Sequence, residues 1–104
     1  FEALREVGAD LGHGSLIALD ERLDRAALER HFWGFAASES CGTCAPCRLG
    51  TQRGLERAEG RGDPNAVSAF DEMLEAMERG SLCAFGRGVA PVVRSIERVY
   101  GQAP

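Results

Sequence analysis

Four cysteines are the residues of this chain whose types and spacing indicate chemistry. Cys41, Cys44 and Cys47 are separated by two residues each, and Cys83 follows alone much later in the sequence. Three thiolates in one short loop can bind three corners of a cubane iron–sulfur cluster, and a remote thiolate can bind the fourth. The chain has four cysteines in all, so this ligand set leaves none over. The spacing therefore favours an iron–sulfur cluster.

Two other uses of four cysteines remain open at this point. A structural zinc site usually takes two separated C-x2-C pairs, which a three-plus-one arrangement matches less well. Disulfides within the 41–47 loop are sterically awkward, and pairing two neighbours there leaves an odd thiol. The composition is also typical of a reducing compartment, where disulfides are rare. A zinc-stabilised interaction module without a redox role is thus the main alternative.

Length, charge and hydropathy restrict the class of protein. A chain of 104 residues forms one small domain or a piece of a larger subunit. Its net charge of −4 argues against nucleic-acid binding. We expect no direct membrane insertion, because no apolar run is long enough to span a bilayer. No signal peptide is visible, so we expect a cytoplasmic location, and the start at Phe1 suggests part of a longer polypeptide.

Residues 1–20 differ in pattern from the rest. Gly8, Gly12 and Gly14 indicate a turn, and residues 15–19 then read as a short buried strand. A lone strand needs partners for its backbone groups, so we expect them outside this chain. The glycines do not form a dinucleotide fingerprint, because they precede a strand instead of leading from one into a helix.

From residue 21 onward, the apolar periodicity predicts four amphipathic helices joined by short links. This pattern indicates an all-α, antiparallel four-helix bundle. The first helix is expected to begin after Asp24 as N-cap and to run to about Ser38. The second has Pro46 in its first turn, a position that proline favours, and its arginines, Arg57 among them, are expected to face outward.

The third and fourth helices are also bounded by sequence signals. Asp63 as N-cap and Pro64 at the first helical position start the third, and Gly80 ends it. Residues 82–86 are expected to form a loop, and the fourth helix ends at Gly101. The expected core residues lie on one stripe of each helix: Leu28, Phe32, Phe35 and Ala36; Leu49, Leu55 and Ala58; Ala66, Val67, Phe70, Met73, Leu74 and Met77; Val89, Val92, Val93, Ile96, Val99 and Tyr100. Trp33 is expected as a further core aromatic.

Two motifs connect the cysteines to a known family. Residues 39–51 match the pattern E-S-C-G-x-C-x-P-C-R-x-G, and residues 81–83 match its S/T-L-C partner. From about Leu11 to Tyr100, the chain resembles the C-terminal iron–sulfur domain of the NADH- and FMN-binding subunit of respiratory complex I. The same module occurs in NAD-reducing hydrogenases and NAD-dependent formate dehydrogenases. Residues 11–15 and the short bundle favour the formate dehydrogenase diaphorase subunit as the parent protein. Complex I and the NAD-reducing hydrogenase remain open as alternatives.

The resemblance implies one [4Fe–4S] cluster held in a four-helix bundle by Cys41, Cys44, Cys47 and Cys83. It implies an electron relay between FMN, reduced by NADH in an upstream domain of the same subunit, and clusters of other iron–sulfur subunits. FMN and NAD(H) would bind outside this chain, which would be a non-catalytic part of an NAD(H)-linked oxidoreductase. Residues 1–20 would end a preceding ubiquitin-like domain, and residues 21–104 would form the iron–sulfur domain.

Residues around the cysteines suit such a site. Gly42 allows a tight bend and lets a backbone N–H approach a sulfide. Cys47 is expected at a helix start, where the helix dipole favours a thiolate. Arg48 either raises the reduction potential or docks a partner, or it is an ordinary solvated cation. His13 and His31 lack the spacing of metal ligands, so we expect structural roles for both.

Overall fold

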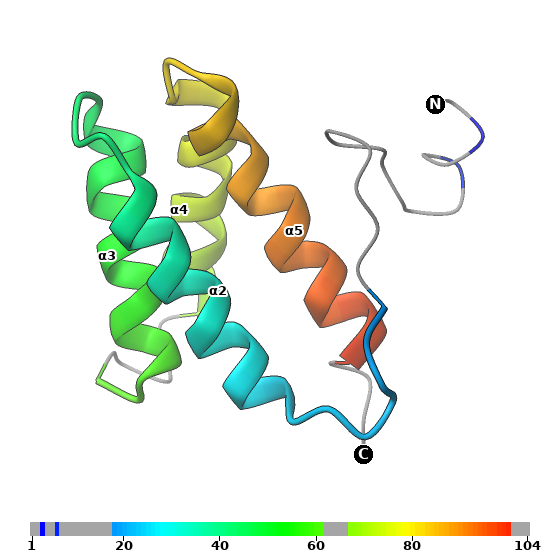
Figure 1. Ribbon diagram of the computed structural model, residues 1–104. Coiled ribbons are helices and arrows are strands. Elements are labelled where there is room, and N and C mark those ends of the chain that lie inside the picture. Colours follow the sequence, from blue (N-terminus) through cyan, green and yellow to red (C-terminus); the bar gives the residue numbers. More distant parts are fainter. Residues whose placement is uncertain (1–2, 4–5, 7–17, 62–66, 101–104) are drawn as a thin grey trace.

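The computed structural model describes residues 3, 6, 18–61 and 67–100. Within these residues lie the four helices α2 (Arg25–Glu39), α3 (Ala45–Ala58), α4 (Val67–Gly80) and α5 (Ala84–Tyr100). Consecutive helices run in alternating directions, and the described part of the chain contains no strand (Figure 1). The all-α, antiparallel four-helix bundle expected from the periodicity is therefore confirmed.

This topology places both cysteine loops at one end of the bundle. Helix α2 packs along α3, α4 packs along α5, and α3 also adjoins α4. Because α3 leads away from the first loop and α4 returns to the same end, the α2–α3 loop and the α4–α5 loop are neighbours (Figure 1). The up-and-down order of the helices thus joins sequence-distant cysteines.

Most predicted helix boundaries are confirmed. Asp24 is the N-cap of α2, and its carboxylate accepts the N–H of Ala26 at 3.1 Å. Pro46 lies in the first turn of α3, and α4 ends at Gly80. The predicted loop over 82–86 is too long, because α5 already begins at Ala84.

Three predicted boundary residues, Asp63, Pro64 and Gly101, lie outside the described residues. The predicted strand at 15–19 also lies mostly outside them. Of that segment, Ala18 and Leu19 are described, and both are exposed and outside any strand. The division into residues 1–20 and 21–104 stays a prediction.

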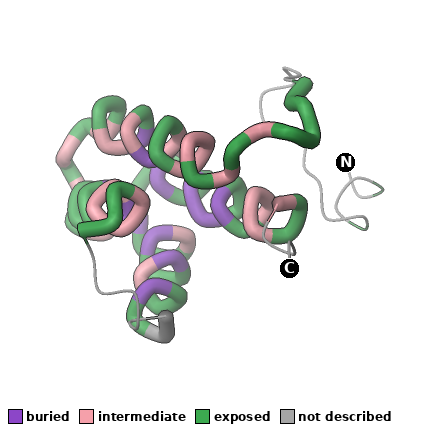
Figure 2. Tube along the Cα trace, turned by 90° about the horizontal axis from the view of Figure 1, so that it is seen from below, coloured by how far each residue is buried: buried purple, intermediate pink, exposed green. Residues whose placement is uncertain are grey.

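The core fills the space between the four helices, as the inward-facing purple segments of Figure 2 show. Trp33 meets Phe70 edge to face with ring centroids 6.2 Å apart, and it meets Phe32 in the same way at 5.8 Å. Arg57, predicted to point outward, instead lies 4.0 Å above the ring of Phe70. The buried core residues are Trp33, Ala36, Phe70, Leu74, Met77, Val89, Ala90 and Val93.

Helix α3 turns its smallest residues toward this core. Gly50 and Gly54 are buried, and a Cβ atom added to either would lie 2.3 Å from Met77 or Trp33. Large neighbouring side chains therefore occupy the space that a leucine on this face would need. The prediction that Leu49 points inward is wrong, since 53% of it is exposed.

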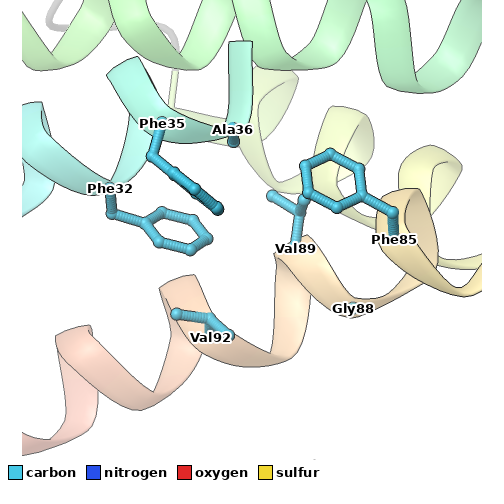
Figure 3. Close-up of a pocket in the computed structure, with 7 residues that line it drawn as sticks. All are labelled: Phe32, Phe35, Ala36, Phe85, Gly88, Val89 and Val92. Carbon is cyan, nitrogen blue, oxygen red and sulfur yellow. The ribbon is translucent and has the colours of Figure 1, made fainter. Parts of the chain in front are cut away.

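Three apolar residues of the other helices are also more exposed than predicted. Phe35 is 54% exposed because α2 presents Trp33 and Ala36 to the core instead. Val92 and Val99 are 42% and 66% exposed. Phe35 and Val92 line an apolar hollow between α2 and α5 (Figure 3). Among the described residues, no helix is long and apolar enough to cross a membrane.

Candidate metal centre

Two of the four cysteines cap helices. Cys44 is the N-cap of α3, and its carbonyl accepts the N–H of Arg48 at 3.0 Å. Cys83 directly precedes α5, and its carbonyl accepts the N–H of Arg87 at 3.3 Å. The positive ends of two helix dipoles therefore lie beside these cysteines, and that position favours thiolates and bound anions.

The loop before α3 is held by hydrogen bonds between its own residues. Gly42 has φ +77°, a conformation that favours glycine, and its N–H donates to Ser40 Oγ at 3.3 Å. Ser40 Oγ also lies 3.4 Å from Sγ of the buried Cys47. The exposed Cys41 thiol donates to Thr43 Oγ1 at 3.2 Å. Several contacts within a few residues thus hold the shape of this loop.

Two thiols of this loop have lowered pKa values. The Thr43 hydroxyl, and then the Thr43 backbone, hold the pKa of Cys41 below its usual value by hydrogen-bonding the thiolate. The pKa of Cys44 is lowered first by the backbone N–H of Leu82, then by that of Cys47, and to a smaller extent by the Ser81 hydroxyl. Since Leu82 belongs to the α4–α5 loop, this contact joins the two cysteine loops. It also favours the thiolate, which is the form that binds metal.

An arginine follows each capping cysteine by four residues and reaches back to the loop. Arg48 donates from Nη1 to the carbonyl of Gly42 at 2.8 Å. Arg87 donates from Nε to the carbonyl of Ser81 at 2.9 Å and from Nη2 to that of Leu82 at 3.3 Å. Arg48 is therefore more than a solvated cation. Sequence reasoning missed Arg87, although the shared spacing of cysteine and arginine could have indicated it.

Three further residues around the cysteines were given no role from the sequence. Thr51 is fully buried and donates to the carbonyl of Cys47 at 2.8 Å. Ser81 is only 2% exposed, and within the described part of the chain its hydroxyl oxygen has no hydrogen-bond partner. Such a buried polar group costs about 1–3 kcal/mol when left unpaired. A Cβ atom at Gly86 would lie 2.5 Å from that oxygen and 3.0 Å from Cys47 Cβ.

The two cysteine loops lie next to each other, and the four cysteines differ in how far they are buried. All four cysteines are free; Cys47 is buried, Cys44 is half-buried, and Cys41 and Cys83 are exposed. Within residues 18–61 and 67–100, no three His, Cys, Asp or Glu side chains form a site for a single metal ion. His31 is exposed, and His13 lies outside the described residues. Four thiols, two helix N-termini and an unpaired hydroxyl are donors that suit an anionic cluster.

Several known proteins resemble this chain. The F subunit of NADH-quinone oxidoreductase in Escherichia coli (strain K12) is 31% identical over 96% of the chain, which covers 24% of that relative. The F 1 subunit of the enzyme in Rhizobium meliloti (strain 1021) is 32% identical over 86% of the chain and is covered to 22%. The chain therefore spans about a quarter of the length of these relatives.

A solved structure shares the fold. The crystal structure of the NAD+-reducing [NiFe]-hydrogenase in the H2-reduced state matches 88% of the chain with a TM-score of 0.72 and 33% identity, over 17% of the hydrogenase chain. Residues 27–103 match the family described as the NADH-ubiquinone oxidoreductase-F iron-sulfur binding region. That segment contains all four cysteines and the two loops that hold them. The chain belongs to this iron–sulfur binding family.

Proposed function

We propose that this chain binds one [4Fe–4S] cluster through Cys41, Cys44, Cys47 and Cys83 and serves as an electron relay. When bound, the cluster would accept and release single electrons. In the proposed parent, an NAD(H)-linked oxidoreductase, FMN and NAD(H) bind in an upstream domain of the same subunit, and other iron–sulfur subunits exchange electrons with this one. The chain itself supplies ligands and surroundings and no catalytic residue.

The close packing of Ser81 and Gly86 against Cys47 carries this proposal. A Cβ atom at Gly86 would lie 2.5 Å from Ser81 Oγ and 3.0 Å from Cys47 Cβ, so the segment around Cys83 lies against the three-cysteine loop. Both capping cysteines are at helix N-termini, where backbone N–H groups and dipoles stabilise negative charge. Family membership over residues 27–103 supports the same assignment.

Metal analysis of the purified chain tests the proposal. We expect about four irons and four acid-labile sulfides per chain for one cubane cluster. We also expect a broad visible absorption band that dithionite bleaches. One zinc and no sulfide would favour the zinc-stabilised module instead.

The division of labour within the parent subunit can be tested separately. The loaded 104-residue chain is expected to accept electrons from dithionite and not from NADH, even with FMN supplied, because hydride chemistry belongs to a cofactor bound elsewhere. Adding the upstream domain should make NADH an effective reductant. Rapid reduction of the isolated chain by NADH would contradict this division.

The identity of the parent enzyme is a finer proposal. A formate dehydrogenase diaphorase subunit is favoured by residues 11–15 and the short bundle. The relatives described above are subunits of NADH-quinone oxidoreductase and an NAD+-reducing hydrogenase. The sequence encoded upstream of Phe1, together with the subunits that copurify with the full polypeptide, would discriminate among the three. The cytoplasmic location stays a prediction.

A further inference from the structure

Ser81 is the buried polar residue whose role the proposed ligand set does not explain. It precedes Cys83 by two residues in the α4–α5 loop, and its side chain is 2% exposed. Its hydroxyl oxygen has no hydrogen-bond partner in the part of the chain that the structure describes. A buried hydroxyl without a partner is unfavourable, so its presence points to an acceptor that the hydroxyl gains when the site is occupied.

The surroundings of Ser81 place that acceptor near the cysteines. The position that a Gly86 Cβ would take lies 2.5 Å from Ser81 Oγ and 3.0 Å from Cys47 Cβ. Glycine at 86 therefore leaves the hydroxyl room beside Cys47. The Leu82 N–H and the Ser81 hydroxyl both help to lower the pKa of Cys44, which agrees with this packing of the Ser81–Leu82 segment against the three-cysteine loop.

Ser40 gives a useful comparison within the same site. Its hydroxyl oxygen already accepts the Gly42 N–H and lies 3.4 Å from Cys47 Sγ. This arrangement leaves the hydroxyl hydrogen of Ser40 free to face sulfur. Ser81 comes from the opposite loop. Its hydroxyl makes no hydrogen bond of normal geometry within the described residues, yet it lies near enough to Cys44 to help lower the pKa of that thiol. The two serines thus approach the loop sulfurs from different segments of the chain.

We propose that Ser81 is a positioning residue whose hydroxyl donates a hydrogen bond to the thiolate sulfur of Cys44 when the cluster is bound. The inference rests on the proposed function. A hydrogen bond to a cluster sulfur stabilises the more negatively charged, reduced state and so raises the reduction potential. Removal of the donor should therefore make the cluster harder to reduce, without loss of any ligand.

The test compares Ser81→Ala with Ser38→Ala in the cluster-loaded 104-residue chain. Ser38 is exposed on α2 and controls for loss of a serine hydroxyl. In an EPR-monitored redox titration, we expect about a tenfold shift of the one-electron equilibrium toward the oxidised state in Ser81→Ala, or about 59 mV. The Ser38→Ala midpoint should equal that of the unmodified chain.

A spectroscopic signature separates hydrogen bonding from a general packing effect. Electron–nuclear double resonance of the reduced cluster in H2O and D2O should detect an exchangeable proton coupled to the cluster. That coupling should disappear in Ser81→Ala and persist in Ser38→Ala. An unchanged midpoint in Ser81→Ala, or retention of every exchangeable coupling, would overturn the inference.

Two further outcomes have separate meanings. If Ser81→Ala loses its cluster, the isosteric pair Ser81→Thr and Ser81→Val replaces it, because only threonine keeps the donor. A more negative midpoint in the valine variant supports the inference, and equal midpoints overturn it. An unmodified chain that binds no iron and sulfide would instead contradict the proposed function.

Discussion

The α2–α3 loop and the α4–α5 loop share one plan and differ in how they are held. Each has a cysteine at the start of a helix and an arginine four residues later that donates back to the loop. The first loop has three cysteines and local hydrogen bonds from Ser40 and Thr43. The second has one cysteine and rests on the buried Ser81 and the glycine at 86.

The first loop supplies three of the four proposed ligands, whereas the second loop connects the site to the packed interior of the bundle. The first loop has several hydrogen bonds between residues close in sequence. The second loop packs against α3, because a Cβ atom at Gly86 would lie close to both Ser81 and Cys47. We therefore expect changes in the second loop to affect folding and the site together.

Loss of the only cysteine of the second loop should have the largest effect. Cys83→Ser is expected to abolish or convert the cluster and to loosen the contact between the loops, because no other thiol in that loop can replace it. Iron, sulfide and EPR spectra measure the result. Leu82→Ala is the matched control, since its side chain is 69% exposed. Unchanged spectra in Cys83→Ser would remove Cys83 from the ligand set.

A methyl group at Gly86 should have the next largest effect. Its Cβ would approach Ser81 Oγ and Cys47, and such overpacking costs about 1–3 kcal/mol. Gly88 lies in the same helix, and a Cβ there would meet nothing within 4 Å. Gly88→Ala should instead stabilise the helix by about 0.5–1 kcal/mol. Chemical denaturation of the cluster-free chain measures both, and equal stabilities would show that the second loop is not tightly packed.

The two arginines should contribute unequally. Arg87 makes two bonds to the second loop, one of them half-buried, whereas the Arg48 bond to Gly42 is exposed. Arg87→Met should cost about 1 kcal/mol and Arg48→Met less, because water competes for exposed bonds. Arg53→Met is the control, since its ion pair with Glu56 is on the surface. Amide hydrogen exchange in both loops measures the result. A larger loss of amide protection in Arg48→Met than in Arg87→Met would contradict this prediction.

The sequence predicted the bundle and the cysteine motifs well, and it failed where packing decides orientation. The Asp24 cap and the third helix follow from local rules, so both could be predicted. Leu49 and Phe35 were misplaced because periodicity counts apolar residues and cannot foresee that glycines admit Trp33 and Met77. The role of Ser81 could not be predicted either, since its burial depends on how the two loops meet.

The smallest expected effect concerns the first loop alone. Thr43→Val removes the hydroxyl that chiefly lowers the pKa of Cys41, so that pKa should rise toward its ordinary value. Because alkylation needs the thiolate, the pH profile of Cys41 modification by iodoacetamide in the cluster-free chain should move to higher pH. Cys44 is an internal control, since its pKa is lowered first by the Leu82 N–H.

The pH dependence of folding stability gives a second test of the Thr43 hydroxyl. A lowered thiol pKa stabilises the fold above the unfolded pKa, and this contribution is lost as pH falls through the folded one. Thr43→Val should therefore be less stable than the unmodified chain at alkaline pH and equal to it at acid pH. Equal shifts at Cys41 and Cys44, read by mass spectrometry, would show that the first loop is not locally held.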